Sequence, residues 1–307
     1  MKLRPIFITS GVLLVLGIGC VIGGAALNGG TIKNIEQEVF EDKSRTFENC
    51  REITIDDYDT DVEILTTNGE TRVDYTESDK VRYEITETDG KVVIKKKSDI
   101  NLFNYSIITD KQKLTLYVPE GFDGVLDVST SNSELSVEGI SAGGTKLENS
   151  NGSIALTGCS LGDLNVSGSN GRCAITSCHS GETVIDYSNS DVITEELTAS
   201  GKLTVDSSNG TIKLDGITAK ELCAEMSNGQ ITAGTISVLE KAELQNSNGR
   251  ITIGSITASE LAADNSNGGI KLGYADCLRI KLSASNADVT GTLAGTIASY
   301  SVRSEAT

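Results

Sequence analysis

The feature that most constrains the fold is a Ser-Asn-Gly motif that recurs through the C-terminal two thirds of this 307-residue chain. Its Asn falls at nine positions: Asn132, Asn151, Asn170, Asn189, Asn209, Asn228, Asn248, Asn267 and Asn286. Successive Asn residues are 19, 19, 19, 20, 19, 20, 19 and 19 residues apart. Such a regular period over so many copies is typical of a solenoid, in which every repeat forms one turn of a stacked coil.

Apolar residues occupy fixed places on either side of each Asn. Three residues after it come Leu135, Ile154, Cys173, Val192, Ile212, Ile231, Ile251, Ile270 and Val289. Four residues before it come Val128, Leu147, Val166, Ile185, Val205, Ala224, Leu244, Ala263 and Leu282. The position two residues farther from the Asn on each side is mostly apolar as well, and this spacing is typical of strands with one buried face.

The alternation restarts after Asn-Gly, so we expect the chain to turn a corner there. Gly, replaced by Ser133, Ser190 and Ala287 in three copies, suits a corner that needs a left-handed backbone conformation. Each repeat is interpreted as one coil: a strand, the Asn-Gly corner, a second strand, a looser corner near the following Gly, and a short return. Coils that stack through parallel, in-register strands about 4.8 Å apart give a rod on the order of 40 Å long.

We therefore expect an all-β fold: a parallel β-solenoid (a single-stranded β-helix) of about nine 19–20-residue rungs over residues 126–300, with an N-terminal β-cap and a tail at 301–307. One transmembrane helix is expected to precede it. Right-handed winding is the default for parallel crossovers, but so short a coil leaves the hand open.

The column of Asn residues has two interpretations. Amides stacked at strand spacing can hydrogen-bond along the rod and satisfy polar groups at a buried corner, or they can form a polar recognition stripe. Because polar groups at tight, buried turns need partners, we favour a structural ladder.

An uncharged run of 22 residues, residues 6–27, follows the basic residues Lys2 and Arg4. At about 1.5 Å per residue, a helix of this length spans a hydrocarbon core of about 30 Å. The positive-inside rule keeps the N-terminus in the cytoplasm, so residues 1–30 are predicted to be a cytoplasmic tip and signal anchor of a single-pass cell-membrane protein with an extracellular C-terminal domain. A cleavable signal peptide with a site at Gly24-Ala25-Ala26 and a lipoprotein anchor at Cys20 are the alternatives.

Residues 31–45 are polar and are interpreted as a juxtamembrane spacer. After them, short alternating stretches predict strands at residues 52–55, 62–65, 81–85, 92–94 and 114–118, with turns at Asn68-Gly69 and Asp89-Gly90. Pro119 marks a boundary, because proline cannot donate to a sheet ladder. We expect residues 46–125 to form a β-cap that covers the first coil and protects its open sheet edge.

The charge balance argues against a nucleic-acid partner. The chain has 26 basic and 43 acidic residues, a net charge of −17, whereas binding a nucleic-acid backbone needs clustered basic residues. The single histidine, His179, is expected to be exposed among Ser and Thr, and no Gly-x-Ser-x-Gly motif lies near it.

Outward carboxylates three residues before the Asn form a partial stripe: Glu148, Asp186, Asp206, Glu225 and Asp264. Stacked like charges can be bridged by cations, which makes these residues weak Ca²⁺ candidates. A solvated acidic face is favoured, because calcium-binding repeats carry a denser Gly-Asp motif. Carbohydrate-active β-helices need loops that build a groove, and a coil length fixed at 19 or 20 residues leaves none. We expect no catalytic residue, no cofactor and no enzyme activity.

The seven cysteines, an odd number, argue against a disulfide framework. Cys159, Cys173 and Cys178 fall in inward columns and are expected to be small apolar core residues. Cys159 and Cys178 lie one rung apart, where a disulfide would be strained. Cys223 is expected to face outward as a free thiol.

The sequence resembles a bacterial adhesin-like β-strand-repeat family, catalogued as domain of unknown function 4097. The resemblance covers about residues 46–300 and rests on the early Ile-x-Ile and Asp-Val-Glu-Ile strands, on Leu-Tyr-Val-Pro at residues 116–119, and on the repeated Leu-x-Val-x-x-Ser-Asn-Gly-x-Ile rungs behind an N-terminal anchor. It implies a surface-exposed β-solenoid, associated in some members with envelope-stress genes, and it supplies no catalytic motif.

From these observations we expect a non-enzymatic, membrane-anchored cell-surface scaffold that acts as an adhesin or in envelope interactions. Its membrane contact is expected through residues 6–27, and its partner is expected to be a cell-wall or host-surface polymer or an envelope protein. An envelope-stress accessory protein that acts through a membrane partner is the alternative. A carbohydrate-active β-helix enzyme ranks third.

Overall fold

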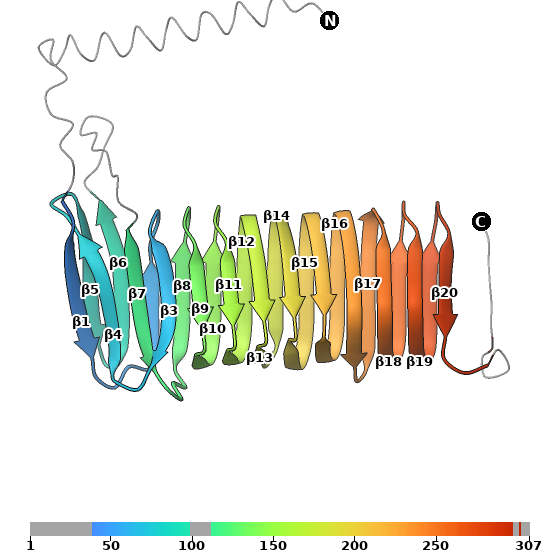
Figure 1. The fold of residues 1–307 in the computed structure, drawn as a ribbon, viewed down its shortest axis with the longest axis horizontal. Helices are drawn as coiled ribbons and strands as arrows, with labels where there is room; N and C mark the ends of the chain where they lie inside the picture. Colours follow the sequence, from blue (N-terminus) through green and yellow to red (C-terminus); the bar gives the residue numbers. More distant parts are fainter. Residues whose placement is uncertain (1–38, 99–111, 297–300, 302–307) are drawn as a thin grey trace, which may run out of the picture. The chain divides into compact units, whose positions relative to one another are not determined.

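The alternating columns fold as strands. The computed structural model describes residues 39–98, 112–296 and 301, and these residues form twenty strands and no helix (Figure 1). The strands are β1 (Glu41–Phe47), β2 (Glu52–Asp56), β3 (Asp61–Thr67), β4 (Thr71–Glu77), β5 (Val81–Thr88), β6 (Lys91–Ser98), β7 (Lys113–Pro119), β8 (Val125–Thr130), β9 (Leu135–Glu138), β10 (Ser141–Asn149), β11 (Ile154–Thr157), β12 (Ser160–Thr176), β13 (His179–Ser180), β14 (Thr183–Glu195), β15 (Thr198–Asp215), β16 (Ile217–Val238), β17 (Lys241–Asn248), β18 (Ile251–Asn265), β19 (Ile270–Ala284) and β20 (Val289–Leu293). The chain divides into two compact units, and every strand belongs to the larger one, Phe40–Ser98 with Lys111–Thr307.

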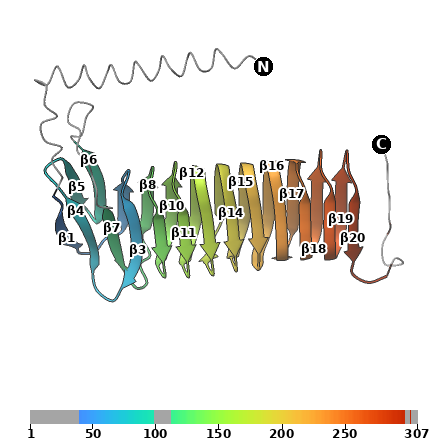
Figure 2. The ribbon, with the colours of Figure 1, turned by 45° about the horizontal axis from the view of Figure 1, so that its top comes forward.

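Parallel pairing joins each repeat to the next in the register that the period predicts. Ile212 pairs with Ile231, and Ile231 pairs with Ile251. At the corner, Asn209 pairs with Asn228. Figures 1 and 2 show the resulting rungs stacked side by side from β8 to β20. The prediction of a parallel β-solenoid of about nine turns is confirmed.

The inward columns form one continuous core. Ile212, Ile231 and Ile251 are fully buried, and a single cluster of buried apolar side chains runs from Phe47 to Cys277. The predicted inward positions of the three cysteines in these columns are confirmed, since Cys159, Cys173 and Cys178 are all buried. Each rung is covered mainly by its two neighbours, so the stability of the rod depends on close stacking.

Stacking and backbone conformation both explain the corner glycines, four of which have the positive φ that the sequence predicts: Gly171, Gly210, Gly229 and Gly249. Gly229 has a φ of +146°, and a Cβ there would lie 1.9 Å from the carbonyl oxygen of Gly210 in the rung before it. Close backbone approach therefore selects Gly at this corner. Positive φ values also occur at the second corner, where Ser177 and Glu196 have φ values of +52° and +55°.

The region before the repeats contains more of the solenoid than the sequence predicted. β2 and β3 pair in parallel with β8 and β9, and β6 and β7 pair in parallel with β2 and β3. Two further rungs therefore precede the first Ser-Asn-Gly repeat. Their period is hidden because β4 and β5 are inserted between β3 and β6 and the corner motif is absent from residues 46–125.

Antiparallel strands close the N-terminal end of this unit. β5 pairs with β6, β4 pairs with β7, and β1 pairs with β4 (Figure 2). The strands predicted in this region are confirmed as β2, β3, β5, β6 and β7, whereas β1 and β4 were not predicted. β1 begins at Glu41, so the prediction of a spacer over residues 31–45 is wrong for residues 41–45. β1 has no alternation of apolar and polar residues that would predict a strand, because six of its seven side chains are exposed.

The predicted membrane anchor at residues 6–27 lies outside the described residues, as do residues 302–307 of the predicted tail. Within the part of the chain that the structure describes, no helix is long and apolar enough to cross a membrane.

Candidate functional site

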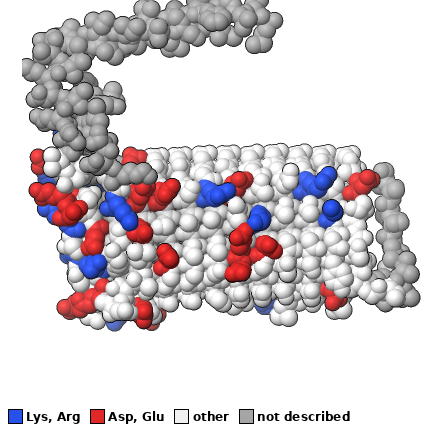
Figure 3. Space-filling view, viewed as in Figure 1, with Lys and Arg blue, Asp and Glu red and all other residues white. Residues whose placement is uncertain are grey.

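Charged side chains are unevenly distributed over the solenoid unit. In the view of Figure 3 they crowd the end formed by β1–β7 and are sparser over the later rungs. Many at the crowded end form exposed ion pairs, such as Lys91 with Glu52 at 2.5 Å and Lys113 with Glu63 at 2.6 Å. Exposed pairs of this kind contribute little to stability, so their main effect is to keep this end solvated.

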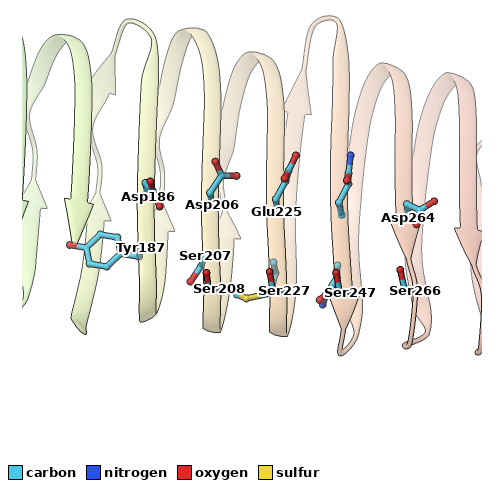
Figure 4. Close-up of a pocket in the computed structure, with 13 residues that line it drawn as sticks. Asp186, Tyr187, Asp206, Ser207, Ser208, Glu225, Ser227, Ser247, Asp264 and Ser266 are labelled. Carbon is cyan, nitrogen blue, oxygen red and sulfur yellow. The ribbon is translucent and has the colours of Figure 1, made fainter. Parts of the chain in front are cut away.

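A polar groove of about 250 Å³ lies beside the Asn corner and crosses five successive rungs, from β14 to β18 (Figure 4). Two columns of side chains line it. One column holds carboxylates, Asp186, Asp206, Glu225 and Asp264, and the other holds hydroxyls, Ser208, Ser227, Ser247 and Ser266. The groove therefore presents the same two chemical groups again and again at the spacing of the strands.

The position of the carboxylates follows from strand alternation. The residue four before the Asn points into the core, so the residue three before it points outward. Parallel register then stacks Asp186, Asp206 and Glu225 directly, and Gln245 interrupts the column before Asp264. Of the five carboxylates predicted to form a stripe, the structure brings only these three into consecutive rungs.

Glu148 lies apart from the groove. Its neighbours in register are Ser129 and Ser167, and its carboxylate contacts Lys146 Nζ at 2.8 Å. Among the described residues, no three His, Cys, Asp or Glu side chains come together as a set of metal ligands. Weak Ca²⁺ binding by Glu148, Asp186, Asp206, Glu225 and Asp264 stays a prediction.

In the groove, burial and neighbouring carboxylates disfavour the charged form of Asp206. Burial is the largest influence that raises the pKa of Asp206, and the neighbouring Glu225 and Asp186 raise it further, while Lys202 opposes them. One oxygen of Asp206, Oδ1, is buried without a hydrogen-bond partner among the described residues. The folded state therefore holds this charge at a cost.

Because Asp206→Asn removes this unfavourable charge, we expect the substitution to stabilise the fold in a pH-dependent way. Because the pKa of Asp206 is raised on folding, its charge opposes folding at neutral pH, and the opposition disappears as the pH falls through the folded and then the unfolded pKa. We expect Asp206→Asn to raise the free energy of unfolding by about 0.5 kcal/mol at pH 7, a small value because solvent screens a half-exposed charge. At pH 3 the gain should vanish. Urea unfolding at both pH values measures it.

Asp264→Asn is the matched control for that substitution. Its neighbours in register are Gln245 and Ser283, neither of which is charged, so its removal should change stability less at pH 7. Equal effects of the two substitutions would show that repulsion within the column is negligible.

The Asn column forms an unbroken chain of side-chain hydrogen bonds. Each Asn from Asn151 to Asn286 donates through Nδ2 to Oδ1 of the Asn one rung earlier, at 2.8–3.2 Å. Asn132 ends the chain by donating to Asp59 Oδ1 at 2.7 Å. All nine side chains are exposed rather than buried. In the rungs of the groove, ladder Asn residues directly follow groove serines in the sequence, as Asn209 follows Ser208. Three ladder amides, those of Asn209, Asn248 and Asn286, also donate to the carbonyl of a serine in the rung before.

A second, buried set of amides lies two residues before the ladder and was not predicted. Asn149, Asn246 and Asn265 occupy an inward position and donate to backbone carbonyls of Ser133, Gly229 and Gly249 at 2.7–3.0 Å. They satisfy the carbonyls at the tight corner, the role that the sequence analysis gave to the exposed column. The signal available in the sequence was a polar residue at a position where alternation demands an apolar one.

A buried charge network in the N-terminal rungs was not predicted either. Lys96 Nζ lies 3.6 Å from Asp57 Oδ1, and both side chains are at most 3% exposed. Lys96 Nζ also donates to the carbonyl of Tyr58 at 2.7 Å and to Thr60 Oγ1 at 2.5 Å, while Tyr83 Oη donates to Asp57 Oδ2 at 2.6 Å. Alternation from Val92 and Ile94 places Lys96 inward, and this was the available signal.

Burial dominates the electrostatics of this network. It raises the pKa of Asp57 and lowers the pKa of Lys96, in each case against the attraction of the other residue. Burial also raises the pKa of Tyr83 well above its usual range. The pair is held by its hydrogen bonds, and its position away from the groove indicates a structural role.

His179, Cys159 and Cys178 do not line the groove, whereas Cys223 Sγ donates to Oε1 of the groove carboxylate Glu225 at 3.7 Å. His179 is exposed and pairs in register with Ser160 and Thr198, as predicted. All six cysteines in the described residues are free, so Cys159 and Cys178 stack without a disulfide. Burial and the nearby Glu225 raise the pKa of Cys223 to about 11, which keeps this thiol protonated and unreactive.

The rungs, the exposed amide ladder and the polar groove define a β-solenoid scaffold. The chain belongs to the Toastrack DUF4097 family, whose profile matches residues 50–207, just over half of its length. This confirms the resemblance seen in the sequence. No curated protein matches the chain.

Several solved structures are similar to this chain. One, named "putative adhesin" from Parabacteroides merdae ATCC 43184, is 14% identical, covers 83% of this chain and 96% of its own, and has a TM-score of 0.44. A second of that name from Parabacteroides distasonis ATCC 8503 is 16% identical over 83% of this chain and 97% of its own, with a TM-score of 0.45. A "putative lipid binding protein" from the same strain is 14% identical, with a TM-score of 0.45. The match covers 81% of this chain and 96% of that protein.

Proposed function

We propose that this protein is a non-enzymatic, membrane-anchored surface scaffold that contacts its partner through the groove and the adjoining Asn ladder. The observation that carries the proposal is the repetition of one polar surface, since carboxylate or amide, serine and ladder Asn recur over five rungs. A partner with a repeating structure of its own can meet this surface at several rungs at once. Weak contacts then add up through multivalency.

The chemistry of the groove narrows the class of partner. Its carboxylates accept hydrogen bonds and attract cationic groups, and its serines and amides both donate and accept. Hydroxyl-rich and amine-bearing polymers of cell walls and mucous surfaces offer the complementary groups. The uniform coil length between Asn132 and Asn286 supports a contact surface rather than a walled active site, because no loop is inserted in these rungs.

The predicted anchor completes the proposal. Residues 6–27 would hold the chain in the cell membrane, and the solenoid unit begins at its N-terminal end with β1. In this proposal the solenoid unit lies outside the cell, where its groove can meet a partner.

Co-sedimentation of the purified full chain, kept in mild detergent, with cell-wall sacculi and with insoluble mucin tests the function. We expect saturable binding to at least one polymer, and binding that needs added Ca²⁺ would assign the carboxylate column to a cation. Failure to bind either polymer with or without Ca²⁺ would contradict the proposal. The accessory role, in which the anchor reaches a membrane protein, would then be favoured.

A further inference from the structure

The two ends of the solenoid unit differ in the strands that form their outer edges. At the N-terminal end the outermost strands are β1 and β5, which are antiparallel to their neighbours and carry charged side chains, including Glu41, Lys43 and Arg82. Charged, antiparallel edge strands discourage pairing with other chains. At the other end the last strand in Figure 1 is β20, which pairs with β19 alone among the described residues. Its five side chains are all exposed.

The last rung presents core positions to solvent. In the column that follows the Asn by three residues, Ile251 and Ile270 are at most 1% exposed, but Val289 is 42% exposed. On the opposite strand, Ile280 and Leu282 are only partly buried, although their equivalents one rung earlier are buried. The C-terminal face, defined here as β20 with residues 280–284, therefore has an apolar centre, and no described strand pairs with its outer edge.

Exposed apolar side chains gather near this face. Seven large apolar residues are exposed in the described part of the chain. Val289 and Leu293 lie in β20, and Tyr274 and Leu278 lie in β19, one rung before it. The most exposed is Leu278, at 85%. Solenoids need a polar cap for solubility, so an apolar terminal rung requires a covering.

The low charge of this end of the chain favours a second copy as the partner that covers the apolar face. Residues 280–296 contain only Lys281 and Asp288, which cancel, whereas the whole chain has a net charge of −17. Two copies of the chain repel each other least when they approach through this neutral end. A head-to-tail approach would instead place the apolar face against the charged strands β1 and β5, which cannot bury it.

We propose that the C-terminal face docks on the C-terminal face of a second copy, so that two solenoids pair tail to tail. A two-fold axis perpendicular to the rod makes β20 antiparallel to its equivalent in the second copy and covers Val289 and Leu293 on both sides. Such a contact is isologous and closes as a dimer, without growth into fibres.

Tail-to-tail pairing has a consequence that rests on the proposed function. The N-terminal strands of the two copies lie at opposite ends of the pair, so chains held on two surfaces by their N-termini can pair in this way. A second copy is then a further partner, beside the polymer proposed for the groove. Because the face is small, each contact is weak, and the number of copies on each surface provides the strength.

Clustering of beads tests the pairing without the membrane or a polymer. Full-length chain in mild detergent is attached to beads through its N-terminus, which leaves the C-terminal face outward. We expect these beads to cluster, and beads attached through the C-terminus to stay dispersed. Val289→Lys with Leu293→Lys should abolish clustering, because lysine protects an edge strand. Val125→Lys, at an exposed valine near the other end, is the control and should cluster like wild type.

Thr290→Lys with Thr292→Lys keeps the core positions intact and guards against a folding defect in the first variant. Dispersed wild-type beads, or clustering that survives both lysine pairs, would overturn the proposal. Clustering that begins only after residues 297–307 are deleted would overturn it too, since that segment would then be the covering. Binding to sacculi or mucin is measured separately, so either proposal can fail while the other stands.

Discussion

Gly229→Ala is expected to destabilise the solenoid by about 3 kcal/mol, the sum of backbone strain at a positive φ and of overpacking. Gly229 has a φ of +146°, and an added Cβ would lie 1.9 Å from the carbonyl oxygen of Gly210. That oxygen belongs to the backbone of the preceding rung, so it cannot move without separating the rungs. Chemical denaturation of the wild type and the variant gives the difference in the free energy of unfolding.

Gly144→Ala provides the matched control for this substitution. A Cβ at Gly144 meets nothing within 4 Å, and its φ is not positive. We expect no loss, or a gain of about 0.5 kcal/mol from reduced freedom of the unfolded chain. If both alanines cost the same, close approach of the rungs at the Asn-Gly corner is not what selects glycine there.

Lys96→Met is expected to cost about 3–5 kcal/mol, because it leaves the carboxylate of Asp57 buried without its counter-charge. Removal of Lys96 also raises the pKa of Asp57 further. Asp57 then binds a proton at higher pH in the folded state, so the loss of stability should shrink as the pH falls. Thermal unfolding at pH 8 and pH 4.5 measures both effects.

Lys97→Met controls for the loss of a lysine from β6. Lys97 is exposed and its Nζ lies 3.4 Å from the carboxylate of Glu84, which is also exposed, so its substitution should cost less than about 1 kcal/mol. Adding Asp57→Asn to Lys96→Met should restore part of the lost stability. Equal melting curves for the two lysine variants would show that the buried pair contributes nothing to the fold.

The repeats made the solenoid predictable because residues one repeat apart in the sequence lie in contact in neighbouring rungs. Once Ile212, Ile231 and Ile251 were placed in one column, parallel register and burial followed. The rungs formed by β2, β3, β6 and β7 were not predictable in the same way. They stack by the same rule, but β4 and β5 interrupt the spacing, and no Asn-Gly corner marks the turn.

The candidate site was predictable only in part. Outward carboxylates such as Asp206 follow from strand alternation, but the hollow beside them does not. It depends on what fills the inward position two residues before the Asn, which varies from Tyr187 to Met226 to Asn246. Conversely, the exposed position of Asn151 differed from expectation because the carbonyls at the corner are satisfied by a different residue, Asn149.

Contact through the groove is tested most directly by comparing two charge-matched variants in the sedimentation assay with sacculi and mucin. The groove variant combines Asp186→Asn, Asp206→Asn, Glu225→Gln and Asp264→Asn. The control removes four exposed carboxylates from the N-terminal strands through Glu41→Gln, Asp42→Asn, Glu84→Gln and Glu87→Gln. We predict that the groove variant loses binding to the polymer that the wild type sediments with, while the control retains it. Equal binding by the two variants would contradict the claim that this protein meets its partner through the groove.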